Sequence, residues 1–598
     1  DWSSDVCSSD LFIGGGGYLG YQHISEFKTN ENYREQIVEL NNEFVQVPLP
    51  STTAHAVSLE HKGQTIEAVS QMTLKNENSH ELNKLIFSLN DGLEINNFTW
   101  NGTSLPFRRE NHLLIVEKNG ILSPGEEAVA VIDYEGKINE SLCYLDIDEK
   151  TRQEKYGKFV LNVDKRYAFL TPEYVLLTSE ANWYPKTGVT YSTEDVSWNQ
   201  PEFIDFSLEV KTAPKLQAVS QGQMQEISQG HFSFGSEVPF TQISLAIGKY
   251  EKKEMIVDSL KLGVWHIKGH DFFSGEFPET NDTIPQLIGE RLGDFERTYN
   301  LEYAFERLFL VEVPAQFKTY ERIWTSRHEF IQPEQVLIPE KGYLIREADF
   351  EGTRKRMERW GRRGDNNMTD EDIEIRLINN FLETFTRELA TDWRGSRGQF
   401  TIEEFPNPYF IFPQFYNFQN NIQSDRWPII NRIFEAYLKS QSTDMRSGWM
   451  RNMQGMSDDE LANIALQDST FEEIISDPDQ KKIIDNVIKL KGEVLFSMVE
   501  VKAGQEAFEN FLRSLLEEYR FKNISFDRFD GRIKEQFNTE LSPMMDEWFK
   551  AKSLPGYLIS NLEDVKVKSG NAMKTKVDLK ITNFSDTEGI VKITFRLG

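Results

Sequence analysis

Hydrophobic and polar residues alternate over a long stretch of the chain, from about residue 51 to residue 250. Such alternation places every second side chain on one face of a strand, so it is typical of half-buried β-strands. Clear examples are Val57 and Leu59, Met72 and Leu74, and Leu85, Phe87 and Leu89. Turn residues such as Asp91-Gly92 separate the runs. The pattern predicts a β-sandwich or a saddle-shaped sheet in this part of the chain.

The pattern changes at about residue 251, where strands predicted near Val264 and over 308–313 are followed by long helical stretches. The clearest helix runs from Gln505 to Tyr519, because its apolar residues recur at steps of three and four. Two more strands are predicted over 577–581 and 591–595. A lone pair of strands is marginal by itself, so they predict the start of a truncated β-domain.

Length, charge and cysteine content narrow the class of protein. A chain of 598 residues exceeds a single hydrophobic core, so several domains are expected. A formal net charge of −29 with no basic stripe disfavours nucleic acid as a partner. Cys7 and Cys143 are too few for a disulfide framework or a cysteine zinc site.

The first fifty residues contain two segments that are not expected to belong to the folded domains. Residues 1–11, DWSSDVCSSDL, resemble the translation of a sequencing adapter and are treated as an artefact. Residues 12–50 begin with a glycine run and continue as a polar, helix-leaning segment. We interpret them as the exit end of a transmembrane helix followed by a linker, with a loose terminus as the alternative.

Histidine positions decide which metal sites the sequence can offer. All nine histidines lie at or before His328, and no HExxH motif occurs. Such a motif needs two imidazoles four residues apart on a helix, with the intervening Glu as general base. Only His266 and His270 have this spacing, but Trp265 and Ile267 favour a strand, on which the two rings would lie far apart. No P-loop, dinucleotide-binding glycine motif or serine nucleophile elbow is present.

One stretch of the chain, residues 491–557, carries a family signal. It contains Lys491-Gly492-Glu493, a helix ending in Glu518-Tyr519-Arg520, then Trp548 and Leu554-Pro555-Gly556-Tyr557. These residues resemble the end of the catalytic region in aminopeptidase N and leukotriene hydrolase, which are members of peptidase family M1. The segments 122–136 and 182–185 also resemble that family, in the right order, so the resemblance covers about 51–557.

The resemblance implies a multidomain α+β architecture. It consists of an N-terminal β-sandwich or saddle domain, a thermolysin-like α+β domain with a helical C-terminal part, and the start of a truncated β-domain. The expected boundaries are 51–250, 251–455 with an insertion over about 351–400, 456–556, and 557–598.

The amine-binding motif of the family, G-x-M-E-N, is matched by Arg327-His328-Glu329-Phe330-Ile331. Only Glu329 is retained, and the resemblance implies that it is a vestigial substrate-binding residue. An ordinary salt-bridged Glu is the alternative.

The position of the family's third zinc ligand carries a cation. Residues 427–437, WPIINRIFEAY, resemble the helix that supplies this ligand, and Arg432 stands where the ligand Glu belongs. A guanidinium stays protonated and cannot coordinate a metal ion. The family's transition-state tyrosine corresponds to Lys489.

The best match to HExxH is the segment 413–417. It places Pro413 and Asn417 at the two imidazole positions and Gln414 at the general base, although a neutral amide cannot take a proton from water. The resemblance therefore implies a chain with no catalytic residues and no metal or other cofactor, although zinc is expected for the family.

The combined features resemble the extracytoplasmic half of bacterial proteins that fuse an ABC-type permease to an aminopeptidase-like region. We expect a non-catalytic module at the outer face of a bacterial inner membrane, with a permease half and an ABC ATPase as partners. It would bind a peptide or protein, or act as a scaffold; a former cleft packed by Phe415, Tyr416 and Phe418 would favour the scaffold. The alternative is an active zinc aminopeptidase with a non-standard site built from His266, His270 and Glu329.

Overall fold

The computed structural model describes most of the chain outside its first residues. The described residues are 24–153, 164–342, 345–361, 368–396, 399–440, 458–477, 480, 483–550, 552, 554–570, 572–585, 589–591 and 593. The adapter-like segment 1–11 and the glycine run over 14–17 lie outside them.

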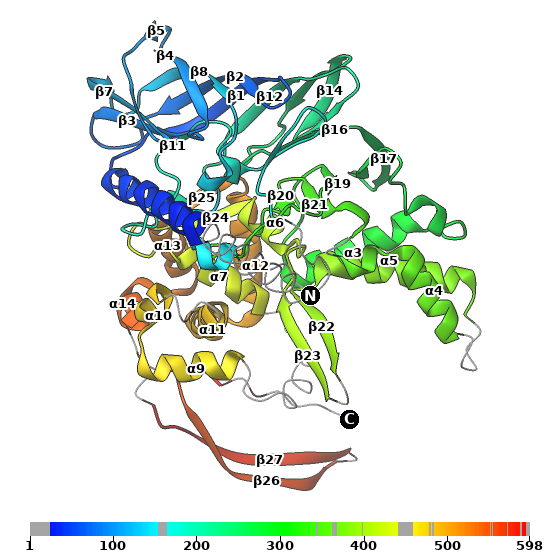
Figure 1. Ribbon diagram of the computed structural model, residues 1–598. Coiled ribbons are helices and arrows are strands. Elements are labelled where there is room, and N and C mark those ends of the chain that lie inside the picture. Colours follow the sequence, from blue (N-terminus) through cyan, green and yellow to red (C-terminus); the bar gives the residue numbers. More distant parts are fainter. Residues whose placement is uncertain are drawn as a thin grey trace, which may run out of the picture.

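The first large body of the chain is built from β-sheets, as the alternating pattern predicts (Figure 1). Its eight-stranded sheet has the order β14-β15-β12-β1-β2-β8-β4-β5. The strands are β1 (Ser51–His61), β2 (Ile66–Lys75), β4 (Leu93–Trp100), β5 (Thr103–Ser104), β8 (Glu127–Gly136), β12 (Asp205–Lys211), β14 (Gln223–Ser228) and β15 (His231–Gly235). Buried and more exposed residues alternate along β2 and β8, which places one face of this sheet in the core.

Two four-stranded sheets complete the β region, with orders β11-β3-β7-β6 and β13-β16-β10-β9. Their strands are β3 (Leu82–Ser88), β6 (Arg108–Glu110), β7 (Leu113–Leu122), β9 (Phe169–Leu170), β10 (Val175–Leu177), β11 (Lys186–Thr187), β13 (Gln217–Val219) and β16 (Leu245–Gly248). The helix over residues 24–44, dark blue in Figure 1, packs Phe44 and Val45 against Ile86 and Ile115. The polar segment before residue 50 is thus helical and packed against a sheet.

A five-stranded sheet with the order β17-β18-β19-β21-β20 follows the β region. The strands are β17 (Tyr250–Val257), β18 (Leu260–Ile267), β19 (Arg307–Val313), β20 (Ile331–Gln332) and β21 (Gln335–Pro339). Helix α3 (Ile284–Tyr299) joins β18 to β19, and β18, β19 and β21 run parallel. The carboxyl ends of these three strands therefore lie at one edge of the sheet.

The remaining chain is mainly helical. Its longer helices are α4 (Phe350–Gly361), α5 (Asp370–Thr386), α6 (Phe412–Asn417), α7 (Ile430–Ser440), α9 (Asp458–Asp468), α10 (Phe471–Ser476), α11 (Ile484–Ala503), α12 (Gln505–Glu518), α13 (Phe526–Phe537) and α14 (Ser542–Lys550). Three two-stranded sheets lie among them, β22 (Leu389–Ser396) with β23 (Gln399–Pro406), β24 (Asn420–Gln423) with β25 (Lys522–Ser525), and β26 (Tyr557–Ser569) with β27 (Ala572–Asn583). Short helical turns and α2 (Glu149–Arg152) occupy connections.

The predicted fold class is confirmed: a β-rich first part precedes a mixed α+β part whose later half is helical. The helix predicted from Gln505 is α12, and the strand predicted over 308–313 is β19. The strand predicted over 577–581 exists within β27, and β26 is its pairing partner in the described chain. Of the strand predicted over 591–595, only residues 591 and 593 are described, and neither is in a strand.

The predicted insertion over 351–400 is helical only in its first part. Helices α4 and α5 pack Phe350, Ile373 and Leu377 against Phe277 and Ile284, and the β22–β23 hairpin follows them. In the part of the chain that the structure describes, no helix has the length and apolar character needed to cross a bilayer.

Candidate functional site

The predicted zinc-helix segment 413–417 forms most of α6, and its side chains are in the protein interior. All six residues of α6 are buried. The Phe415 ring lies 5.0 Å from that of Phe295, and the Phe412 ring lies 4.7 Å from that of Tyr299, both on α3. Phe415, Tyr416 and Phe418 are all 0 % exposed. Aromatic side chains therefore fill the space around α6.

The polar residues of α6 make short-range contacts within this packed region. Gln414 donates from Nε2 to the Tyr303 hydroxyl at 3.3 Å, while its Oε1 is buried without a hydrogen-bond partner in the described chain. Asn417 donates from Nδ2 to Glu435 Oε2 at 3.3 Å. None of these groups is an imidazole or a free carboxylate.

Arg432 lies one helix away, on α7, at the position predicted for the third zinc ligand. Its side chain is 5 % exposed, its Nη1 lies 3.4 Å from Glu435 Oε1, and its Nη2 contacts Asp485. Burial disfavours the charge, but Asp485 and Glu435 outweigh it and raise the pKa of Arg432, so the guanidinium stays protonated. Lys439 lies 3.1 Å from the same Glu435 carboxylate. These residues do not fit a divalent cation, because the carboxylates are already paired with fixed cations.

One further carboxyl group, that of Glu321, adjoins this network. Burial, followed by the neighbouring Asp485 carboxylate, raises the pKa of Glu321 to about 8. Asp485 itself has a lowered pKa, since Arg432 outweighs the effect of its burial. Lys489, at the predicted tyrosine position, lies on α11 and forms an ion pair of 3.6 Å with Asp459.

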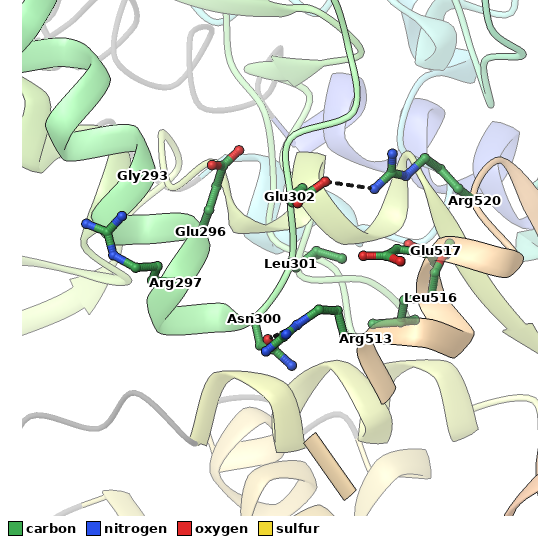
Figure 2. Close-up of a pocket in the computed structure, with 11 residues that line it drawn as sticks. Gly293, Glu296, Arg297, Asn300, Leu301, Glu302, Arg513, Leu516, Glu517 and Arg520 are labelled. Atoms are coloured by element: carbon green, nitrogen blue, oxygen red, sulfur yellow. Dashed lines mark hydrogen bonds and ion pairs between the residues drawn. The ribbon is translucent and has the colours of Figure 1, made fainter. Parts of the chain in front are cut away.

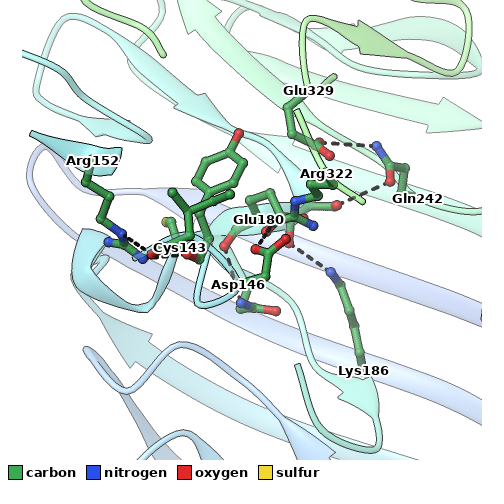
Figure 3. A network of polar contacts seen from close by, with 12 residues as sticks. Cys143, Asp146, Arg152, Glu180, Lys186, Gln242, Arg322 and Glu329 are labelled. Carbon is green, nitrogen blue, oxygen red and sulfur yellow. Dashed lines mark hydrogen bonds and ion pairs between the residues drawn. The ribbon is translucent and has the colours of Figure 1, made fainter. Parts of the chain in front are cut away.

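Glu329 belongs to a second buried polar network (Figure 3). Its carboxylate accepts from Gln332 Nε2 at 2.9 Å and from Gln242 Nε2 at 3.4 Å, and the residue is 4 % exposed. Burial, followed by the Glu180 carboxylate, raises the pKa of Glu329. Arg322 donates two hydrogen bonds to the Glu180 carboxylate, of 2.9 and 2.6 Å. The role of Glu329 in amine binding stays a prediction.

A third group of side chains lies at the edge of the five-stranded sheet. The potential ligand atoms of His270, Glu312 and Glu340 all lie within 4.8 Å of one another, which makes this a group that could hold a metal ion. His270 Nδ1 lies 2.6 Å from Glu312 Oε1. Neither His266 nor Glu329 is part of the group. The structure thus joins His270 to two carboxylates that the sequence analysis did not consider, and not to the partners expected for it.

Comparison with known proteins matches one segment of the chain to a family. Residues 428–548 match the Peptidase family M1 domain. The resemblance to peptidase family M1 is confirmed. A curated relative, the probable aminopeptidase 1 of Sulfurisphaera tokodaii, is 24 % identical to this chain over 139 residues. The alignment covers 22 % of this chain and only 17 % of the length of that aminopeptidase.

Among solved structures, similarity is found to an M1 zinc metallopeptidase from Deinococcus radiodurans. A mutant form of that protein is 14 % identical, with 85 % of this chain and 96 % of that chain covered and a TM-score of 0.46. The corresponding structure of the M1 zinc metallopeptidase without a stated mutation gives 13 % identity, 86 % and 96 % coverage, and a TM-score of 0.43.

The M1 segment runs from the loop before α7 into α14, so two of the changed motif positions, Arg432 and Lys489, lie inside it. The α6 positions Pro413, Gln414 and Asn417 precede it. Their correspondence to the M1 zinc motif therefore stays a prediction.

The expectation that this M1-like chain has no metal cofactor is wrong as stated, because His270, Glu312 and Glu340 form a group that could hold an ion. The M1 motif presents two imidazole ligands on one helix, and no such pair occurs in the sequence. Here the candidate ligands come from the ends of three different strands, so no short sequence motif contains them.

A pocket of about 350 Å³ lies between the end of α3 and α12 (Figure 2). Charged side chains dominate its lining, including Glu296, Arg297, Glu302, Arg513, Glu517 and Arg520. Arg513 donates to Asn300 at 2.6 Å, and Arg520 forms an ion pair of 3.4 Å with Glu302. The pocket is lined by neither Glu329 nor the α6 residues, so it is separate from the predicted cleft.

Proposed function

We propose that this chain is an aminopeptidase-like module that does not hydrolyse peptides at the region of α6 and α7 and acts instead as a protein scaffold. The observation that carries the proposal is the packing around α6, whose six side chains are all buried. Peptide hydrolysis needs space for a substrate and a group that takes a proton from the attacking water. The interior around α6 offers Gln414, an amide, among aromatic rings.

The surroundings of Glu329 favour a scaffold over a peptide receptor at the same place. A carboxylate that grips the amino group of a peptide has to be reachable from solvent. Glu329 is 4 % exposed and already accepts hydrogen bonds from two glutamines. Opening this network to a ligand would leave buried polar groups unpaired, at a cost of about 1–3 kcal/mol for each group.

The test of this proposal is an activity assay on the purified chain supplied with Zn²⁺. We expect no saturable hydrolysis of a panel of aminoacyl-p-nitroanilides, and no difference between the chain and its Arg432→Ala variant. Saturable turnover that Arg432→Ala or Gln414→Ala alters would overturn the proposal, because it would place a reaction at α6 and α7.

The candidate metal group at the sheet edge favours one other function that can be tested. In that case the chain is an aminopeptidase with a non-standard site. Turnover that is unchanged in Arg432→Ala but lost in His270→Ala would support that function instead. The two variants thus separate the two candidate locations within one assay.

We further propose that the module works at the outer face of a bacterial inner membrane, with a permease half and an ABC ATPase as partners. The support for this proposal is the resemblance of the sequence to permease–aminopeptidase fusions. Cell fractionation of the natural gene product checks it: recovery with the membranes and digestion by protease added to spheroplasts are expected, whereas recovery in the cytosol would contradict it.

A further inference from the structure

Three parallel strands bring a histidine and two glutamates to one edge of the five-stranded sheet. The β18–β19 pairing reaches Trp265 opposite Val311, and the β19–β21 pairing reaches Val313 opposite Pro339. His270 follows β18 by three residues, Glu312 is the next-to-last residue of β19, and Glu340 comes directly after β21. The carboxyl ends of parallel strands are a frequent place for ligand sites, because side chains from several strands meet there.

The charge at this edge is not balanced by protein cations. Glu312 is 6 % exposed, and among the described residues the one basic side chain within ion-pair distance of it is His270. No lysine or arginine of the described chain forms an ion pair with Glu312 or Glu340, whereas most other buried carboxylates discussed above contact one. Burial of a carboxylate without compensating charge is costly, and a bound cation supplies that charge.

Glu312, the most buried of the three candidate ligands, is held in place by hydrogen bonds to its side chain and to its backbone. Ile267 N donates to Glu312 Oε2 at 2.6 Å, which leaves Oε1 to face His270 Nδ1. The Tyr250 hydroxyl donates to the Glu312 carbonyl oxygen at 2.7 Å and fixes this end of β19. Hydrogen bonds of this kind orient metal ligands in proteins. His270 is 31 % exposed, so an ion and its water ligands can reach the group.

We propose that His270, Glu312 and Glu340 bind one divalent transition-metal ion, with Zn²⁺ as the best fit. One imidazole and two carboxylates supply nitrogen and oxygen ligands that zinc accepts, and water completes a coordination of four. The ion takes the place of the hydrogen bond between His270 Nδ1 and Glu312 Oε1. It links the segments that follow β18 and β21 to β19, and thereby stabilises the sheet edge. The site does not depend on whether α6 and α7 are catalytic.

Metal content measured by mass spectrometry tests the site directly. The chain is stripped with chelator, incubated with a small excess of Zn²⁺, desalted and analysed. We expect about one zinc per chain, and a loss of at least tenfold in affinity in His270→Ala and in Glu340→Gln. The matched control is His231→Ala, since His231 Nε2 lies 2.7 Å from Glu209 Oε1 in a comparable pair that is not part of a group of three possible ligands in the described chain.

Cobalt substitution and thermal unfolding give readouts that do not depend on activity. Visible absorption of the Co²⁺-loaded chain is expected to change in Glu340→Gln and to stay the same in His231→Ala. Zn²⁺ is expected to raise the melting temperature of the chain and of His231→Ala by a few degrees, and not that of His270→Ala. The proposal is overturned if the chain takes up neither metal, or if His270→Ala and Glu340→Gln bind it as tightly as the unchanged protein.

Discussion

Two carboxyl groups, Glu321 and Asp485, illustrate how single residues adapt to the packed interior near α7. Asp485 contacts Arg432 and remains ionised, so Glu321 beside it holds a proton to much higher pH than an ordinary Glu. Burial and the neighbouring Asp485 carboxylate raise the pKa of Glu321, whereas Arg432 lowers that of Asp485 against the effect of its burial. The pair therefore titrates as a unit.

The proton on Glu321 makes the stability of the fold depend on pH. Its pKa is about 8 in the folded chain, against 4.5 for an ordinary Glu, so between these values the folded state binds more protons than the unfolded state. The free energy of unfolding therefore falls as pH rises from about 4.5 to about 8. In Glu321→Gln, the melting temperature is expected to fall less between pH 6 and pH 9, as measured by scanning calorimetry.

Part of the decrease in melting temperature between pH 6 and pH 9 is expected to remain in Glu321→Gln. Burial also raises the pKa of Glu334, to about 7, so this residue contributes with the same sign. A decrease as large as that of the unchanged protein would contradict the assignment of the proton to Glu321.

Among the helices, the close approach of α11 to α7 rests on one glycine. A Cβ at Gly492 would lie 2.8 Å from the carbonyl oxygen of Ile433 and 3.2 Å from its Cγ2. The neighbouring Lys491 donates from Nζ to the Trp548 carbonyl oxygen at 2.8 Å. The Lys-Gly pair that carries part of the M1 resemblance thus fixes α11 against both α7 and α14.

Replacement of Gly492 by alanine tests whether close packing or helix propensity has the larger effect on the free energy of unfolding. We expect Gly492→Ala to lower the free energy of unfolding by about 1–2 kcal/mol, because overpacking outweighs the better helix propensity of alanine. Gly531→Ala on α13 is the matched control: nothing lies within 4 Å of its added Cβ, so a gain of about 0.5–1 kcal/mol is expected. Urea unfolding measures both, and a gain in Gly492→Ala would contradict the close contact.

Some of these elements could be predicted from the sequence, and others could not. The apolar steps of α12 and the run over 308–313 were sufficient to predict a helix and a strand, because each pattern is local. The partner of a strand is not contained in such a pattern: the described partner of β27 is β26, which the alternation over 577–581 does not predict. The His270 group was missed for the same reason, since only the parallel register of β18, β19 and β21 brings Glu312 and Glu340 to it.

At the scale of the whole molecule, one connected core joins the β region to the helices, and the last hairpin lies outside it. That core includes Trp183 of the β region and Phe496 of α11; in the described chain its last buried member is Trp548, and Leu554 packs against it. Beyond it, Leu558, Leu562 and Phe584 are 59 %, 69 % and 74 % exposed. Figure 1 shows β26 and β27 extending away from the helices as a separate ribbon.

A chain that ends at Gly556 tests this division. Because β26 and β27 contribute nothing to the core, its melting temperature is expected to stay within about 2 °C of that of the full chain. Exposed apolar strands promote association, so sedimentation velocity is expected to show less self-association in the shortened chain. Leu562→Lys in the full chain is the matched control, with less association and an unchanged melting temperature. A large fall in the melting temperature on truncation would show instead that the hairpin supports the core.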